Sequence, residues 1–255
     1  MKVTVLSMCL IIAPAIAQEV APVTDADRAA AFSDLGDMSM RTHMDDDPLN
    51  VMFLADRLET RHTQQGSLLA WDASVWVGRD NNKFLLRTEG EMVKGRTEEG
   101  NVEALWAHLI ARWWEVVAGI RNDFRPGPAR NWLALGVTGL APYRFQVEAT
   151  AYVGDAGRTA MQLQTEYELL LTNRLILQPR LELNACGKDD PSRGIGSGVS
   201  DLELGLRLRY EIRREIAPYV GVAWVNKFGE TADLARAQGA ASHEVQAVAG
   251  PRVWY

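Results

Sequence analysis

The sequence predicts an all-β protein: a transmembrane antiparallel up-and-down β-barrel of about twelve strands, preceded by a flexible N-terminal tail. Three observations carry this prediction. The chain starts like an exported protein, apolar and polar residues alternate in segment after segment, and the last residue is aromatic. The overall charge of −6 in 255 residues argues against a nucleic-acid partner.

Residues 1–17 have the three parts of a signal peptide. Lys2 is followed by an apolar run over 3–12 and then by Ala15, Ile16 and Ala17, which form a small-x-small cleavage site. The mature chain is therefore expected to begin near Gln18. Because no other stretch approaches the roughly 18 to 20 apolar residues that a spanning helix needs, an α-helical membrane protein is not expected.

Residues 18–50 contain few large apolar side chains and many acids, so they cannot bury a core. We expect them to form a flexible tail on the periplasmic side of the outer membrane. The barrel is expected to occupy 51–255.

The alternation is clearest in 201–212, where every second residue is apolar and the others are charged or glycine. A helix would spread these leucines around its circumference, whereas a strand places them on one face and the charges on the other. The same rule holds in 160–171 and 174–185. The complete set of predicted strands is 51–62, 67–78, 82–92, 101–111, 113–123, 131–140, 144–154, 160–171, 174–185, 201–212, 214–228 and 243–255.

Connections between these strands alternate in length, as short periplasmic turns and longer extracellular loops do in outer-membrane barrels. The longest predicted loops, 94–100, 124–130, 187–196 and 229–242, all fall at odd-numbered connections. Tyr255 ends the last strand with the kind of terminal aromatic that barrel-assembly machinery recognises. Outer-membrane lipid and that machinery are therefore expected partners. Alternation alone would also fit a soluble sandwich, but the export signal, aromatic terminus and loop lengths favour the barrel.

The polar face of the predicted strands is densely charged. Its members are Arg57, Glu59, Arg61, Asp72, Arg87, Glu89, Glu91, Glu103, Glu115, Arg121, Asp123, Glu148, Glu166, Glu168, Arg180, Glu182, Asp201, Glu203, Arg207, Arg209, Glu211 and Arg252. They could form a structural salt-bridge network that closes the bore, or a stepwise path for cations. His108 is placed on the same face near Glu103, where it could bind a metal or simply join the hydrogen-bonded network.

Of the two cysteines, Cys9 would leave with the signal peptide, so Cys186 would have no disulfide partner. A structural free thiol is favoured over a metal ligand. No Gly-x-Ser-x-Gly element is present, and we do not expect an enzyme.

Four ordered segments carry a more specific likeness: 69–73, 123–128, 166–180 and 194–201. They resemble the copper resistance protein B family. The resemblance implies an outer-membrane barrel that handles copper, with copper ions and a periplasmic copper-resistance protein as partners. The sequence departs from the family at Pro251, inside the last strand, where proline is tolerated only at an edge or bulge.

Family members usually carry a Met- and His-rich N-terminal region, reduced here to Met38, Met40, His43 and Met44. Reduced copper prefers thioether sulfur, and oxidised copper prefers imidazole and oxygen. These four residues, followed by acids, therefore suggest a copper-binding site. The expected function is to bind copper and either sequester it or move it across the outer membrane. The alternative is a structural or general porin-like barrel without specific metal handling.

Overall fold

The computed structural model describes residues 24–27, 48–64 and 66–255. The chain divides into two units, 1–46 and 47–255, and the second unit is the barrel. The predicted signal peptide and most of the predicted tail lie outside the described residues.

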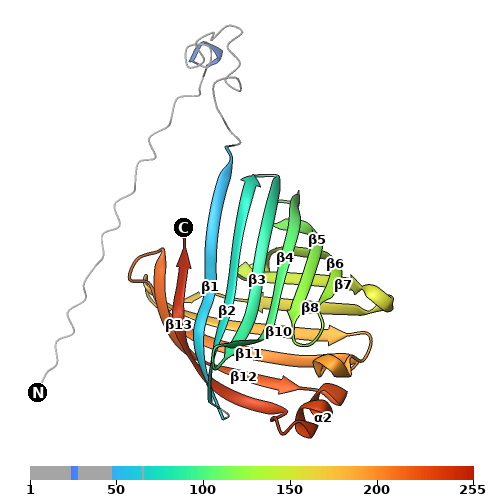
Figure 1. Ribbon diagram of the computed structural model, residues 1–255. Helices are drawn as coiled ribbons and strands as arrows, with labels where there is room; N and C mark the ends of the chain where they lie inside the picture. The colour runs from blue at the N-terminus through green and yellow to red at the C-terminus, as the bar shows by residue number, and fades with distance from the viewer. Residues whose placement is uncertain (1–23, 28–47, 65) are drawn as a thin grey trace, which may run out of the picture. The chain divides into compact units, whose positions relative to one another are not determined.

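The barrel is built from antiparallel strands that follow one another around the wall (Figure 1). β1 pairs with β13, and β10 pairs with β11, so the sheet closes. The strands are β1 (Asn50–Thr63), β2 (Gly66–Arg79), β3 (Asn82–Val93), β4 (Arg96–Ala111), β5 (Trp114–Arg125), β6 (Arg130–Ala141), β7 (Phe145–Gly154), β8 (Thr159–Glu166), β9 (Leu169–Leu170), β10 (Leu175–Cys186), β11 (Gly198–Tyr210), β12 (Ile216–Lys227) and β13 (His243–Trp254). The helical elements are η2 (Pro142–Arg144), η3 (Asp155–Gly157), η4 (Pro191–Arg193) and α2 (Gly229–Ala237).

β8 and β9 are two parts of one strand, because both pair with β10. The interruption lies opposite Pro179. The amide of Tyr167 donates to the carbonyl of Pro179 at 3.1 Å, but proline has no N–H with which to return the bond. Counting β8 and β9 together, the described barrel has twelve strands, which confirms the predicted number.

The two ends of the barrel differ. At the short-turn end lie the connections 80–81, 112–113, 142–144, 171–174 and 211–215, the start of β1 and the C-terminus. At the long-loop end lie Gln64 and the connections 94–95, 126–129, 155–158, 187–197 and 228–242. α2 belongs to this second end, opposite the C-terminus (Figure 1).

The predicted long loop over 94–100 is wrong. β4 begins at Arg96, so only Lys94 and Gly95 connect β3 to β4. Both have positive φ, 50° and 78°, as a tight two-residue hairpin requires. Residues 96–100 instead lengthen the wall at the long-loop end.

Large apolar side chains cover the outer face of the wall. Leu133, Leu135 and Val220 are each at least 60% exposed. Such an apolar outer surface is what a barrel presents to lipid. No helix in the described part of the chain combines the length and the apolar character of a membrane-spanning helix.

β1 and β13 close the barrel with an interrupted ladder. The register breaks between Ala55 and Thr60 on β1, which corresponds to Gly250–Arg252 on β13. Pro251 falls in this break and faces Pro218 of β12. The last strand therefore accommodates a proline because the ladder beside it is already irregular.

Candidate functional site

The inward face of the wall carries the charges, as the alternation predicts. The buried charged residues include Arg57, Glu59, Arg61, Glu103, Asp123, Glu166, Arg180, Glu203, Arg207 and Arg209. Buried charges are costly unless they are paired, so their partners decide what the lumen can do.

Glu59 is fully buried and joins three strands. Its carboxylate accepts hydrogen bonds from Arg61 at 2.8 Å, from Arg207 of β11 at 2.9 and 3.0 Å, and from the hydroxyl of Tyr219 of β12 at 3.0 Å. Arg61 in turn pairs with Glu203 at 2.9 Å. These contacts tie β1 to β11 and β12 across the inside of the wall.

A second set of pairs lies next to the first. Arg57 pairs with Asp72 at 3.1 Å and approaches Glu182 and Glu203, each at 3.8 Å. Arg180 of β10 contacts Glu182 at 3.4 Å and Asp72 at 3.5 Å, which carries the network across the lumen. We call Arg57, Glu59, Arg61, Asp72, Arg180, Glu182, Glu203 and Arg207 the central ion-pair layer.

Glu103 organises the β3–β7 side of the lumen. It pairs with Arg87 at 2.7 Å and Arg121 at 3.4 Å, and it accepts a hydrogen bond from the hydroxyl of Tyr152 at 2.7 Å. Arg87 also pairs with Glu148. Toward the short-turn end this side continues as an apolar cluster of Leu105, Ala107, Val117, Ala134 and Tyr152. The ion pairs around Glu103 and this apolar cluster together fill the middle of the barrel on this side.

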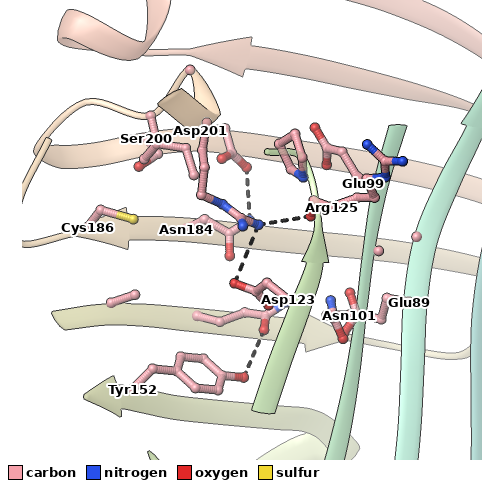
Figure 2. Close-up of a pocket in the computed structure, with 18 of the residues that line it drawn as sticks. Glu89, Glu99, Asn101, Asp123, Arg125, Tyr152, Asn184, Cys186, Ser200 and Asp201 are labelled. Atoms are coloured by element: carbon pink, nitrogen blue, oxygen red, sulfur yellow. Dashed lines mark hydrogen bonds and ion pairs between the residues drawn. The ribbon is translucent and has the colours of Figure 1, made fainter. Parts of the chain in front are cut away.

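A cavity of about 310 Å³ lies on the long-loop side of the central ion-pair layer. Arg57, Arg61, Glu182 and Glu203 of that layer line it. Figure 2 shows two walls: Glu89, Glu99 and Asn101 lie on one side, and Asn184, Cys186, Ser200 and Asp201 on the other. We call this space the mouth cavity.

The loop 187–197 is held against the mouth cavity by Arg193 and Asp190. Arg193 donates to the backbone carbonyls of Arg125 at 2.8 Å and Pro128 at 3.1 Å. Burial acts to raise the pKa of Asp190, but hydrogen bonds from Ser192 and Arg130 outweigh it and hold the pKa below its usual value. Arg193 and Asp190 thus anchor the loop to the end of β5, to the 126–129 connection and to the start of β6.

α2 packs beside this loop. Thr231, Ala232 and Ala235 are its buried residues, and the hydroxyl of Thr231 accepts a hydrogen bond from the amide of Gly196 at 2.9 Å. A side chain at position 196 would collide with Glu230 and Thr231, so glycine is needed where the loop meets the helix.

The predicted copper ligands Met38, Met40, His43 and Met44 lie outside the described residues. Their role stays a prediction. Within the described ranges, no group of three or more His, Cys, Asp or Glu side chains converges closely enough to hold a bare metal ion.

His108 is not on the lumenal face, and that part of the prediction is wrong. It lies five residues from Glu103, which is an odd number, so a regular strand places the two on opposite faces. The ring of His108 stacks on Trp106 with 5.3 Å between centroids, and its Nδ1 lies 3.0 Å from Asn82 Oδ1. His108 therefore belongs to the outer rim at the short-turn end, and its role as a metal ligand stays untested.

Cys186 is a free thiol that lines the mouth cavity beside Ser200 (Figure 2). Its role as a structural thiol stays a prediction.

The sequence reasoning missed several lumenal residues, among them Asp56, Glu99 and Asn101. On a regular strand Asp56 would face outward, because its neighbour Arg57 faces the lumen. A bulge between Ala55 and Arg57 instead lets Asp56 pair with Arg252 at 2.7 Å and Arg180 at 3.3 Å. Glu99 was assigned to a loop, and Asn101 carries no charge. The Lys94–Gly95 turn sequence was the available signal for a longer β4.

Residues 49–255 match the family described as "Copper resistance protein B precursor (CopB)". A copper resistance protein B homolog of Pseudomonas syringae pv. tomato is 51% identical over 234 residues, covering 92% of this chain and 78% of the relative. Copper resistance protein B of Escherichia coli is 47% identical with the same coverage.

Among solved structures, the NanC porin superposes with a TM-score of 0.53 at 12% identity, covering 81% of this chain and all of the porin. That similarity concerns the fold alone. The word "precursor" in the family description agrees with an exported chain. The sequence matches extend over nearly the whole barrel, and on them the chain belongs to the copper resistance protein B family, with a role in copper resistance.

Proposed function

We propose that this protein binds copper at the outer membrane and holds it there, releasing it only stepwise through a charged lumen. The N-terminal tail would lie in the periplasm after removal of residues 1–17, and Met38, Met40, His43 and Met44 would capture the ion. A periplasmic copper-resistance protein would deliver copper to this tail. The short-turn end of the barrel would face the periplasm, as in other outer-membrane barrels.

The observation that carries this proposal is the central ion-pair layer. Arg57 and Arg180 reach carboxylates on several strands, so the layer crosses the lumen instead of lining one side of it. Free diffusion would require these buried pairs to separate, and separated buried charges are costly. A captured ion would therefore be retained unless carboxylates exchanged their guanidinium partners for the ion.

The residue types in the tail support a protein that binds copper in the tail before the ion enters the lumen. Three thioethers and one imidazole suit reduced copper, and the imidazole with Asp45, Asp46 and Asp47 suits the oxidised ion. Such a mixed set can retain copper through a change of oxidation state. The barrel lumen offers oxygen and guanidinium groups instead, so it suits a second, weaker stage.

A porin-like or purely structural barrel is the competing function. The same layer disfavours a general porin, because long Arg and Glu side chains occupy the bore of a twelve-strand barrel. A structural barrel would not need the tail sulfurs.

The decisive experiment measures copper stoichiometry and affinity on the refolded mature protein in detergent. The test variant changes Met38, Met40, His43 and Met44 to alanine. The matched control changes Met52, Met92 and Met161 to leucine, which removes three thioethers from the barrel and leaves the tail intact.

Binding that is lost in the tail variant and kept in the control would support capture by the tail. Binding kept in both variants would move the copper site into the lumen. An absence of copper binding in the wild-type protein would overturn the proposal and favour the structural barrel.

A further inference from the structure

The hairpin of β3 and β4 presents a row of oxygen-bearing side chains to the mouth cavity. Glu91 lies directly opposite Glu99, and Glu89 lies directly opposite Asn101. All four line the cavity. Figure 2 shows Glu89, Glu99 and Asn101 together on the same wall.

Two of these carboxylates lack a cationic partner. Glu91 has Arg61 at 3.5 Å, but among the described residues no Lys or Arg nitrogen lies within 4.0 Å of Glu89 or Glu99. The Lys and Arg residues that line the cavity all lie beyond that distance from both: Arg57, Arg61, Arg121, Arg125, Arg158, Lys188, Arg193 and Lys227. Like charges directly opposite one another destabilise a sheet. Arg61 offsets the charge of Glu91 in the Glu91–Glu99 pair, and the charge of Glu99 is left without an ion pair.

The cross-strand neighbours of Glu89 explain why it is unpaired. Its partner on β2 is Asp72, and its partner on β4 is Asn101. Asp72 is itself engaged by Arg57 and Arg180. No guanidinium is therefore left for Glu89 from the central ion-pair layer.

Asn101 is an independent indication of a ligand. It is only 8% exposed, yet its Oδ1 has no hydrogen-bond partner in the described part of the chain. Buried polar atoms are almost always satisfied, and an exception needs an explanation such as an ion or a water molecule. The side chain lines the same cavity as the free carboxylates, so one ligand could satisfy all three.

We propose that Glu89, Glu99 and Asn101 bind a divalent cation at the long-loop end of the barrel, with Glu91 adding negative charge. Oxygen ligands suit hard and borderline divalent ions, and such ions can keep several of their water molecules when bound. Retained water fits this geometry, because the carboxylates surround a cavity without converging on one point. The cation binds partly through its hydration shell.

This site differs in chemistry from the tail proposed to capture copper. Its three ligands carry no sulfur or imidazole, so it accepts Mn²⁺, which thioethers bind poorly. It binds Cu²⁺ more tightly than Mn²⁺ according to the usual affinity order. It does not depend on the proposed function of the tail. The site lies on the long-loop side of the central ion-pair layer, so it binds cations that enter the barrel from that end.

The test measures Mn²⁺ binding by electron paramagnetic resonance on the full mature protein in detergent, because the signal of free aqueous Mn²⁺ weakens on binding. His43→Ala, Asp45→Asn, Asp46→Asn and Asp47→Asn are present throughout, so that the tail keeps neither its imidazole nor its run of acids. The test variant is Glu89→Gln with Glu99→Gln. The matched control is Glu98→Gln, which removes one charge from an exposed residue of the same hairpin that does not line the cavity.

We expect the double variant to weaken Mn²⁺ binding by roughly tenfold or more, while the control binds like the parent protein. Asn101→Leu, which removes the oxygen and no charge, should also weaken binding. Heat-dependent migration on gels checks that each barrel is folded. Unchanged affinity in the double variant, an equal loss in the control, or no Mn²⁺ binding by the parent would each overturn the site. None of these outcomes depends on whether the tail binds copper.

Discussion

Glu103 and Glu89 are the same residue type, both face the lumen, and they lie on adjacent strands, yet their surroundings are opposite. The residues directly across from Glu103 are Arg87 on β3 and Arg121 on β5. Those across from Glu89 are Asp72 and Asn101. Strand alternation sends both carboxylates inward, but the cross-strand neighbours decide whether a carboxylate is part of the structure or is available to a ligand.

This comparison separates the lumen into two regions with different requirements. In the central ion-pair layer and around Glu103, each carboxylate stabilises guanidinium groups that would otherwise be buried without a partner. In the mouth cavity, Glu89 and Glu99 form no ion pair within 4.0 Å in the described part of the chain. Removing a charge should therefore be harmful in the first region and nearly neutral, or favourable, in the second.

The largest expected effect comes from the two matched truncations. Glu103→Ala leaves Arg87, Arg121 and the Tyr152 hydroxyl without their shared acceptor, and we expect the free energy of unfolding to fall by about 3 kcal/mol. Glu89→Ala should change it by less than about 1 kcal/mol. Urea unfolding in phospholipid vesicles, followed by tryptophan fluorescence, measures both. Equal losses in the two variants would contradict the division of the lumen.

The next prediction tests whether the central ion-pair layer closes the bore. Replacing Arg61 and Glu203 together by serine removes a pair at 2.9 Å and keeps the net charge unchanged. Because both long side chains are lost, single-channel conductance in planar bilayers should rise above the wild-type value. The Glu98→Gln variant should conduct like wild type, and equal conductance in all three proteins would show that the bore is closed elsewhere.

A smaller effect is expected from a single hydroxyl. Tyr219→Phe removes the hydrogen bond to Glu59, a buried acceptor with three other hydrogen bonds, so the free energy of unfolding should fall by about 1.5 kcal/mol. Tyr143→Phe is the control, because Tyr143 is 86% exposed at the short-turn end. The same vesicle assay applies, and a comparable loss in the control would assign the effect to the aromatic ring.

The sequence was sufficient for the features that depend on regular periodicity. The alternation gives the strand number, the apolar outer face and the inward charges, because side chains on a regular strand alternate with a period of two. The same counting places His108 and Glu103 on opposite faces of their strand, because they are five residues apart. The sequence therefore held the information needed to place His108, and the prediction miscounted.

Irregular positions are what the sequence could not supply. Asp56 enters the lumen through a bulge, and a single extra residue reverses the parity of a strand locally. Which carboxylates are paired also depends on register, because a shift of one residue exchanges every cross-strand neighbour. The difference between Glu103 and Glu89 therefore appears only once β2, β3, β4 and β5 are aligned.

The smallest predicted effect concerns the loop above the mouth cavity. Asp190 accepts from Arg130 at 3.2 Å and lies 3.7 Å from Arg158, and its pKa is held below the usual value by hydrogen bonds that outweigh burial. A depressed pKa in the folded state stabilises the protein above the unfolded-state pKa, and the benefit is lost as pH falls through the folded-state pKa. Asp190→Asn should therefore lower the free energy of unfolding by about 1 kcal/mol at neutral pH.

Since asparagine does not titrate, the difference between wild type and Asp190→Asn should stay constant from pH 7 down to about pH 5 and shrink toward zero below about pH 4. Unfolding free energies of the two proteins across that range measure this directly. Asp233→Asn, in the exposed pair with Arg236 on α2, serves as the control and should show little difference at any pH. A gap that persisted at low pH would mean that Asp190 anchors the loop by its shape and not by its charge.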